Sequence, residues 1–337
     1  MAFFTKTTRL ALATAATLAL ALSGCASAPA GNGGNDGDGG SGAPEQPTKI
    51  VIDTTGATGA NEIAKVGGFF DDRLGELGVT DIEYTVIGTS SAMLEGLAAG
   101  QLDFTDIGYP GLPVGAAAGV DFRVIGAASS GGGDVVFTAP DGPQTVAELK
   151  GKKIAAPKGS SGWALLIRAL ADAGLTSADV ELIDLKPDEG QNAFLNDQVD
   201  AWAVWSGQAG GLDESNSRAL VTGEDLGLIP GAIVTTTANA ENDALLAAYL
   251  GARQDALDWF AEDPEAVAEA IAADREMDAA VVTAFIGISS PLNEPVSDQL
   301  LADYQHVADL FFAEGEIAKE VDLTPLISTD AFTRAGL

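Results

Sequence analysis

Basic residues are scarce in this chain of 337 residues. It holds 17 Lys and Arg against 49 Asp and Glu, which gives a formal net charge of −32. Nucleic-acid binding depends on clustered basic residues, and so does attachment to an anionic membrane through a basic patch, so the composition argues against both. The chain is nevertheless 46% apolar, which is enough for a large hydrophobic core.

Cysteine and histidine are almost absent, which restricts the available chemistry. A single Cys excludes an intrachain disulfide, and one His with one Cys excludes a metal site built from several such ligands. His306 is the one residue that a Ser-His-Asp or Cys-His mechanism could use, and it lies in a polar stretch typical of a helix surface. The residues therefore predict no cofactor, no metal and no catalytic side chain.

The N-terminal apolar run is too short to span a membrane. It covers 13 residues, Leu10 to Leu22, after two basic residues, whereas a spanning helix needs about 20. The run ends in Leu22-Ser23-Gly24-Cys25, which resembles the bacterial lipobox, where signal peptidase cuts before a Cys that carries diacylglycerol. The sequence predicts a lipoprotein signal peptide over 1–24, then lipidated Cys25 within a flexible linker over 25–47. The alternative is an ordinary secretory signal with a chance Cys.

From residue 48 onward, short β-rich runs alternate with helical patterns, which predicts βαβ units. Helices are expected at Met93 to Ala99 and from Trp163, where apolar residues recur at helical spacing. After about residue 240 the pattern is helical, with no further strand expected. The expected strands are Ile50 to Asp53, Ile82 to Ile87, Leu102 to Ile107, Phe122 to Ala127, Val135 to Thr138, Lys153 to Ala156, Val180 to Leu185, Ala201 to Trp205 and Ile233 to Thr236.

A body of this length is large for one core, so two lobes are expected. Lobe one is placed at 48–137 plus 238–337, and lobe two at 138–237. The strands Val135 to Thr138 and Ile233 to Thr236 are interpreted as two crossovers that form a hinge. The predicted fold class is α/β, with a mostly parallel sheet flanked by helices in each lobe.

Small polar residues follow five of the expected strands. In open α/β sheets, ligands bind beyond the carboxyl ends of strands, where helix N-termini present free N–H groups. We therefore expect one shared cleft, with Trp205 facing it from a strand tip and Trp202, on the opposite face, in the core. No GxGxxG motif follows the first strand and no P-loop motif occurs, so a nucleotide cofactor is unsupported. The expected ligand-binding residues are Thr54, Thr55, Gly88, Thr89, Ser90, Tyr109, Ser129, Ser160, Ser161 and Trp205.

Segments spread through the body resemble the substrate-binding proteins of ABC importers for aliphatic sulfonates, taurine and nitrate. The matching segments are Gly67 to Asp72, Leu94 to Phe104, Val146 to Ala155, Lys158 to Ser160, Leu165 to Leu175, Asp200 to Trp205 and Asp303 to Phe312. The resemblance covers about residues 48–327 and implies a periplasmic-binding-protein fold that presents a small solute to an ABC permease and its ATPase. It also implies that helix N-termini hold an anionic head, with Trp205 against the tail. The positions implied for the head are Gly88, Thr89, Ser90, Ser160 and Ser161.

The sequence is thus expected to encode a monomeric solute-binding protein, lipid-anchored on the extracytoplasmic face of the cell membrane, for a small sulfonate or similar oxyanion. It departs from the family at Ser206-Gly207-Gln208, where Asp-Pro is usual, and at Asp53. One alternative is the same class of protein binding an amine or heterocyclic, pyrimidine-like solute through Asp53 or Asp106. An enzyme on the same fold and a surface lipoprotein that binds a protein partner are the others.

Replacing the predicted lipid acceptor tests the anchor. Cys25→Ser should abolish lipid attachment and release the protein from the membrane fraction, because serine cannot form the thioether to diacylglycerol. Cell fractionation and the intact mass of the protein measure this. Unchanged membrane retention, with no loss of acyl mass, would contradict the prediction.

Overall fold

The computed structural model describes residues 46–205, 208, 212–288 and 290–337. The predicted signal peptide, Cys25 and nearly all of the predicted linker lie outside the described residues, as do Ser206 and Gly207. The chain divides into the units Met1–Ala43 and Pro44–Leu337, and the second contains all the elements described below. Within the described ranges, no helix has the length and apolar character needed to cross a membrane.

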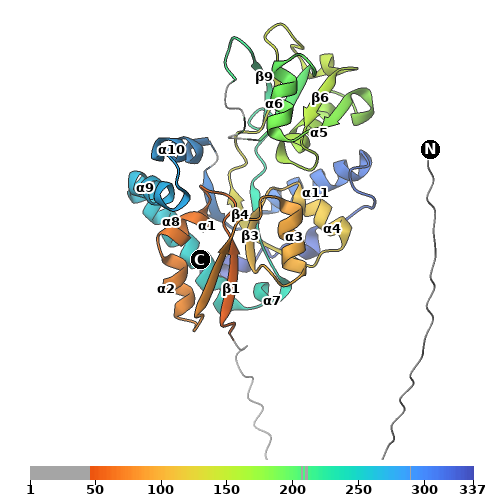
Figure 1. The fold of residues 1–337 in the computed structure, drawn as a ribbon. Coiled ribbons are helices and arrows are strands. Elements are labelled where there is room, and N and C mark those ends of the chain that lie inside the picture. The colour runs from red at the N-terminus through yellow and green to blue at the C-terminus, as the bar shows by residue number, and fades with distance from the viewer. Residues whose placement is uncertain (1–45, 206–207, 209–211, 289) are drawn as a thin grey trace, which may run out of the picture. The chain divides into compact units, whose positions relative to one another are not determined.

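Two mixed sheets form the framework of the second unit (Figure 1). The six-stranded sheet has the order β11 (Pro291–Glu294), β4 (Arg123–Ser129), β10 (Gly231–Thr235), β3 (Phe104–Ile107), β1 (Lys49–Asp53) and β2 (Asp81–Thr85). The five-stranded sheet has the order β7 (Glu181–Asp184), β6 (Lys153–Ala156), β8 (Ala201–Val204), β5 (Val135–Thr138) and β9 (Arg218–Thr222). The α/β class with two helix-flanked sheets, predicted from the sequence, is confirmed.

Each sheet holds one reversed internal strand where the sequence predicts parallel neighbours, and the edge strand β11 also pairs antiparallel with β4. In the first sheet β10 pairs antiparallel with both β3 and β4, and in the second β5 pairs antiparallel with both β8 and β9. Both are the first strand that the chain forms after leaving the other sheet. A strand that enters beside the carboxyl ends of its neighbours has to run against them, so these sheets are mixed.

The passages between the sheets lie at 130–134 and 223–230, next to the strands predicted as crossovers. Val135–Thr138 and Gly231–Thr235 are themselves internal sheet strands. The two passages touch: a Cβ at Gly131 would lie only 2.2 Å from the Ile229 carbonyl oxygen. Gly131 also has a φ of +72°, in the left-handed region that favours glycine. A glycine is therefore required at this close approach.

Two strands are not predicted from the sequence, because their residues carry no clear alternation. The edge strand β11 begins with Pro291, contains Asn293, and pairs with β4 through an irregular register. Proline is tolerated at the first residue of an edge strand, where its missing N–H breaks no ladder bond. The other missed strand is β9, at the edge of the second sheet.

Helices cover both faces of each sheet (Figure 1). On the first sheet, one face packs against α1 (Ala60–Val66), α2 (Phe69–Gly75), α8 (Asp243–Glu262), α9 (Pro264–Arg275), α10 (Ala279–Ile288) and α12 (Ala331–Ala335), and the other against α3 (Ser90–Ala98), α4 (Gly111–Ala118) and α11 (Asp298–Ala313). On the second sheet, α5 (Ser161–Asp172) and α6 (Pro187–Leu195) cover opposite faces, and α7 (Thr237–Ala240) follows β10. Short 3₁₀ turns occur at Val146–Leu149, Ser177–Asp179 and Thr324–Leu326.

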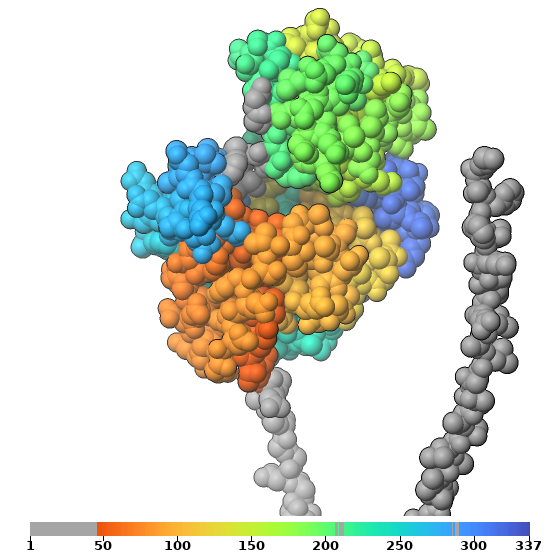
Figure 2. Space-filling view, in the orientation of Figure 1, coloured from red at the N-terminus to blue at the C-terminus, as the bar shows by residue number. Residues whose placement is uncertain are grey.

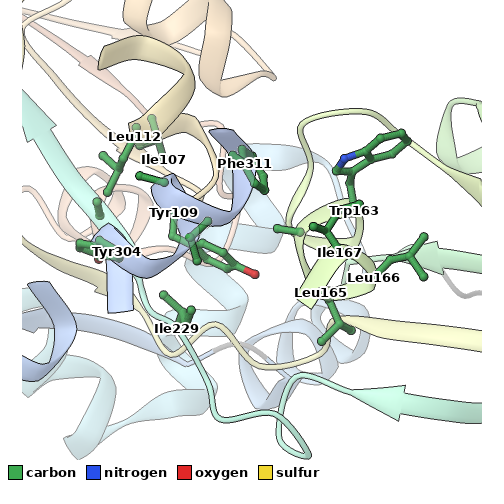
Figure 3. Close-up of a cluster of buried hydrophobic side chains, with 14 of the residues drawn as sticks. Ile107, Tyr109, Leu112, Trp163, Leu165, Leu166, Ile167, Ile229, Tyr304 and Phe311 are labelled. Atoms are coloured by element: carbon green, nitrogen blue, oxygen red, sulfur yellow. The ribbon is translucent and has the colours of Figure 1, made fainter. Parts of the chain in front are cut away.

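Alternation along the strands explains the layers. In β10, Ile233 packs in the cluster with α8, whereas Ala232 and Val234 pack in the cluster with α3 and α11. In β8, Trp202 faces α6. The cluster beneath α5 is continuous with that around α4 and α11, so apolar contacts join the two sheets (Figure 3).

A buried arginine fixes the carboxyl end of β3. Arg253 of α8 is fully buried, and its Nη1 donates to both carboxylate oxygens of Asp106 at 2.9 Å. The same guanidinium donates to Leu292 O at 2.9 Å and to Asn293 Oδ1 at 3.3 Å. Four hydrogen bonds thus hold α8, β11 and the end of β3 together, just before the chain turns into α4.

Breaking this pair should destabilise the fold. Arg253→Met keeps side-chain volume but leaves Asp106 without its cation, so we expect a loss of about 3 kcal/mol in unfolding free energy. This is the lower end for a broken buried pair, because the Asp106 side chain keeps 25% of its exposure. Urea unfolding measures the loss.

The matched control is the exposed pair between Arg73 and Asp255, joined at 2.8 Å. Arg73→Met should change the free energy of unfolding by no more than about 1 kcal/mol. Equal losses in the two variants would show that burial of the Arg253 pair contributes nothing.

Candidate ligand-binding site

A cavity of about 520 Å³ opens between the two sheets, at the carboxyl ends of strands from both. In Figure 2 the surface is hollowed between the part that carries β6 and α5 and the part that carries α3 and α4. The residues that line it are Gly88, Thr89, Ser90, Ser91, Gly108, Pro110, Gly111, Val114, Pro157, Lys158, Gly159, Ser160, Ser161, Trp205, Phe311 and Glu316.

Three helices point their N-termini at this cavity. Thr89 caps α3 and Ser160 caps α5, each by accepting a hydrogen bond from the amide three residues later, at 3.4 Å and 3.1 Å. Pro110 occupies the same position before α4. Capping uses an oxygen lone pair, so the hydroxyl protons of Thr89 and Ser160 and the first amides of each helix stay available to a ligand. The positive ends of three helix dipoles also favour an anion there.

Helix α5 approaches the sheet closely at its first turn. A Cβ at Gly162 would lie 2.6–2.7 Å from backbone atoms of Val204, the last residue of β8. Glycine therefore lets the N-terminus of α5 sit directly over the end of β8. This close packing brings Ser160 and Trp205 to the same wall of the cavity.

The two tryptophans of β8 and its tip lie where strand alternation predicts. Trp202 is fully buried and stacks on Phe137 with ring centroids 6.0 Å apart. Trp205 is half-buried and lines the cavity. A ring in this position offers an apolar wall to a ligand.

Six of the ten ligand-binding residues expected from the sequence line this cavity: Gly88, Thr89, Ser90, Ser160, Ser161 and Trp205. Four do not: Thr54, Thr55, Tyr109 and Ser129. The buried Thr54 accepts a hydrogen bond from Arg275 at 3.0 Å. Ser129 ends β4, where Gly231 packs against it, and Tyr109 is buried in the apolar cluster of Figure 3.

Thr55 shapes the cavity without lining it. Its hydroxyl donates to Asp53 Oδ1 at 2.7 Å and accepts from the amides of Ile87 and Gly88 at 2.9 Å. The carboxylate of Asp53 also accepts from the Thr105 hydroxyl at 3.1 Å. This buried set of hydrogen bonds fixes the turn that leads into α3.

The two acids considered as counter-charges for a cationic solute are both engaged inside the protein. Asp53 is held by the donors just described, and Asp106 is paired with Arg253. Burial raises the pKa of Asp106, while the Arg253 guanidinium opposes that shift. Neither side chain lines the cavity.

One ion pair crosses the cavity wall. Lys158 Nζ lies 3.1 Å from Glu316 Oε2, which joins the segment after β6 to the segment after α11. Among the described residues that line the cavity, these are the one cation and the one carboxylate, so the wall carries no net side-chain charge. Lys158 belongs to a motif noted in the sequence, but nothing near Glu316 in the sequence indicates this contact.

A second carboxyl lies one contact behind the wall. Ser161, the first residue of α5, donates its hydroxyl proton to Asp134 Oδ1 at 2.7 Å. Asp134 is 5% exposed and lies in the passage between β4 and β5. Burial raises its pKa to about 7, against the opposing effects of Ser161 and Arg168.

Replacing each tryptophan by alanine tests whether its ring lies in the core or at the cavity. Trp202→Ala should lower the free energy of unfolding by about 3–5 kcal/mol, because a fully buried ring leaves a large void. Trp205→Ala should cost less than about 2 kcal/mol, since its ring already borders an open cavity. Urea unfolding of both variants measures the difference, and similar losses would place Trp205 in the core.

The chain matches the model of one protein family and resembles solved solute-binding proteins. The family is described as NMT1/THI5 like, and the match covers residues 63–267, more than half of the chain. A Bacillus subtilis protein named for binding aliphatic sulfonates is 33% identical over 279 residues, which is 81% of this chain and 83% of that protein.

Two crystal structures share the fold closely. The periplasmic aliphatic sulphonate binding protein of Escherichia coli is 28% identical with a TM-score of 0.74, covering 84% of this chain and 92% of its own. The alkanesulfonate-binding protein of Xanthomonas axonopodis pv. citri, solved with MOPS bound, is 27% identical with a TM-score of 0.71. The match covers 84% of this chain and 99% of that protein. A desulfurization enzyme, 18% identical with a TM-score of 0.61, shares the fold alone. On the family match and the identity to the B. subtilis protein together, this chain belongs to the NMT1/THI5-like family.

Proposed function

We propose that the protein is the solute-binding component of an ABC importer and captures a small alkanesulfonate or related oxyanion in the cavity between its sheets. The relatives named for sulfonate binding support the class of ligand, as does the related structure with MOPS, itself a sulfonate. The observation that carries the proposal is the convergence of three helix N-termini on one cavity beside Lys158.

The chemistry of a sulfonate suits these donors. Its three oxygens carry one negative charge and only accept hydrogen bonds. The free amides of α3 and α5 and the hydroxyls of Thr89 and Ser160 only need to donate. Charge-assisted hydrogen bonds of this kind are stronger than neutral ones. Lys158 would exchange part of its contact with Glu316 for the sulfonate.

The apolar side of the cavity would hold the alkyl tail. Trp205, Phe311 and Val114 line it, and the volume falls within the range of about 300–1,000 Å³ typical of small-molecule sites. A short alkyl chain against these side chains adds affinity in proportion to its buried area.

The strongly acidic composition does not prevent anion binding at this site. Exposed charges are screened over about 8 Å at physiological ionic strength, whereas hydrogen-bond donors act at contact distance. The wall itself is balanced by Lys158 and Glu316. The net charge of −32 therefore acts on the approach of the ligand more than on its bound state.

Binding would close the two lobes on the ligand. Because β5 lies in the second sheet and β10 in the first, we assign the lobes as 48–129 plus 231–337 and 135–222, in place of the boundaries expected from the sequence, with the movement at the passages 130–134 and 223–230. An anion held by α3 from one lobe and α5 from the other binds the closed form better, and that difference drives closure.

Delivery would take place at the membrane. We propose that the lipid on Cys25 anchors a monomer on the extracytoplasmic face and that the linker lets it reach the permease and its ATPase. We assign no catalytic step. Incubation with a sulfonate followed by NMR should show unchanged ligand, and a new product would indicate an enzyme on this fold.

A ligand panel with three variants tests the function. Calorimetric titration should show binding of pentanesulfonate and none of a matched alkylamine, because the cavity offers donors and its one carboxylate is paired. Ser160→Gly should weaken binding about 5- to 150-fold through loss of one charge-assisted hydrogen bond, while its helix cap loses only a few tenths of a kcal/mol.

Ser160→Asp keeps the capping oxygen and adds a negative charge, so it should abolish binding without lowering the melting temperature. Trp205→Ala should weaken binding of the longer alkyl chains most. Binding of the amine but not of the sulfonate would favour the alternative solute class. Wild-type affinity in all three variants would place the ligand elsewhere.

A further inference from the structure

The hydrogen bond between Ser161 and Asp134 connects the cavity wall to a buried acid. Ser161 lines the cavity at the N-terminus of α5, and its hydroxyl donates to Asp134 Oδ1 at 2.7 Å. Asp134 is 5% exposed and lies in one of the two passages between the sheets. This hydrogen bond therefore joins the cavity wall to a passage between the two sheets.

The ionisation state of Asp134 decides what Ser161 offers to the cavity. An ionised carboxylate only accepts hydrogen bonds, so the single hydroxyl proton of Ser161 is used by Asp134. Toward the cavity Ser161 then presents lone pairs, which a sulfonate oxygen cannot use. The buried negative charge also repels an anion close by.

Protonation reverses this arrangement. A protonated Asp134 donates its own O–H to Ser161 Oγ, and the Ser161 proton is released to point into the cavity. One proton is taken from solvent, the buried charge disappears, and the wall gains one donor for the anion.

The groups packed around Asp134 leave it able to change state. Burial raises its pKa to about 7, and Arg168 of α5 opposes this shift, although the two form no ion pair within 4.0 Å in the described structure. Arg168 instead donates to the carbonyl oxygens of Leu226 and Gly227 at 2.8 Å and 2.9 Å.

Two more segments face this carboxyl. Tyr109, between β3 and α4, extends toward α5 in Figure 3, and burial raises its pKa to about 12, with a further contribution from Asp134. Tyr109 therefore stays neutral when Asp134 titrates. The passage after β9 contributes Gly223, whose amide donates to the Asp134 backbone carbonyl at 2.9 Å and carries no charge.

We propose that Asp134 and Ser161 couple anion binding in the cavity to the uptake of one proton, so that the protein holds a sulfonate more tightly as the pH falls. The inference rests on the proposed function, since it concerns the same cavity and the same class of ligand. Asp134 acts as a positioning residue, because it changes the ligand contact through Ser161.

The sign and range of the effect follow from linkage. Well below pH 7 the carboxyl is already protonated in the free protein, so affinity is constant there. Above pH 7 affinity falls by up to tenfold per unit until the pKa of the complex is reached. One donor gained and one repulsion lost give a total decrease of about 10- to 100-fold between about pH 6 and about pH 9.

The experiment is calorimetric titration of the full chain with pentanesulfonate across this pH range, in two buffers that differ in ionisation enthalpy. The sulfonate stays a monoanion throughout, so any change reports the protein. On binding the sulfonate, wild type should take up a fraction of a proton, and this fraction should increase as the pH rises above 7. Asp134→Asn, whose amide donates to Ser161 Oγ, should bind at all pH values as wild type does at low pH.

Three further variants complete the test. Ser161→Ala should bind weakly and lose most of the pH dependence. Asp184→Asn should keep the pH dependence. It changes an exposed carboxylate that accepts a hydrogen bond from the Lys158 amide at 2.9 Å. His306→Gln should also keep the pH dependence, although His306 lines a separate hollow together with Arg168.

The outcomes separate the two proposals. Wild-type binding with the same affinity at low and high pH and no buffer-dependent heat overturns the proton coupling and leaves the proposed function standing. Loss of the pH dependence in His306→Gln also overturns it. Failure of wild type to bind any sulfonate at any pH overturns both proposals.

Discussion

The carboxyl ends of β2, β3, β6 and β8 lead into the wall of one cavity, and the chain passes between the two sheets twice. This constraint forces β5 and β10 to run against their neighbours, because each enters its sheet from the cavity side. It also directs the helices that follow β2, β3 and β6 with their N-termini toward the same cavity. The direction of these helix N-termini and the two passages between the sheets therefore follow from a single topological feature.

Two acidic side chains that the sequence offered to a ligand serve the structure instead. Asp53 fixes the turn before α3 through Thr55, and Asp106 fixes the end of β3 through Arg253. Asp53 accepts hydrogen bonds from its neighbours, Asp106 is paired with the Arg253 guanidinium, and neither carboxylate lines the cavity. An anion site can thus exist within a chain of net charge −32, since what matters at contact distance is which groups still have protons to donate.

The cavity wall combines fixed donors with two adjustable contacts. The amides at the helix N-termini are held by the backbone and cannot change. Lys158 is paired with Glu316 across the wall, and Ser161 is paired with Asp134 behind it. In the proposed mode of binding, both side chains would leave or reverse a contact when an anion binds. Affinity in such a site depends on the partners of the binding residues as much as on those residues themselves.

The sequence alone determined the α/β class, the positions of most strands, and six residues of the cavity wall. These features are local: a strand followed by a capped helix places small polar residues at a carboxyl end, and alternation puts Trp202 and Trp205 on opposite faces. Tertiary structure alone decided that Thr55 supports a turn instead of lining the cavity, that β11 joins a sheet edge, and that Glu316 and Asp134 meet Lys158 and Ser161. The physical reason is that periodicity and capping are set within a few residues, whereas the partner of a polar side chain depends on which distant segments the fold brings within hydrogen-bond distance.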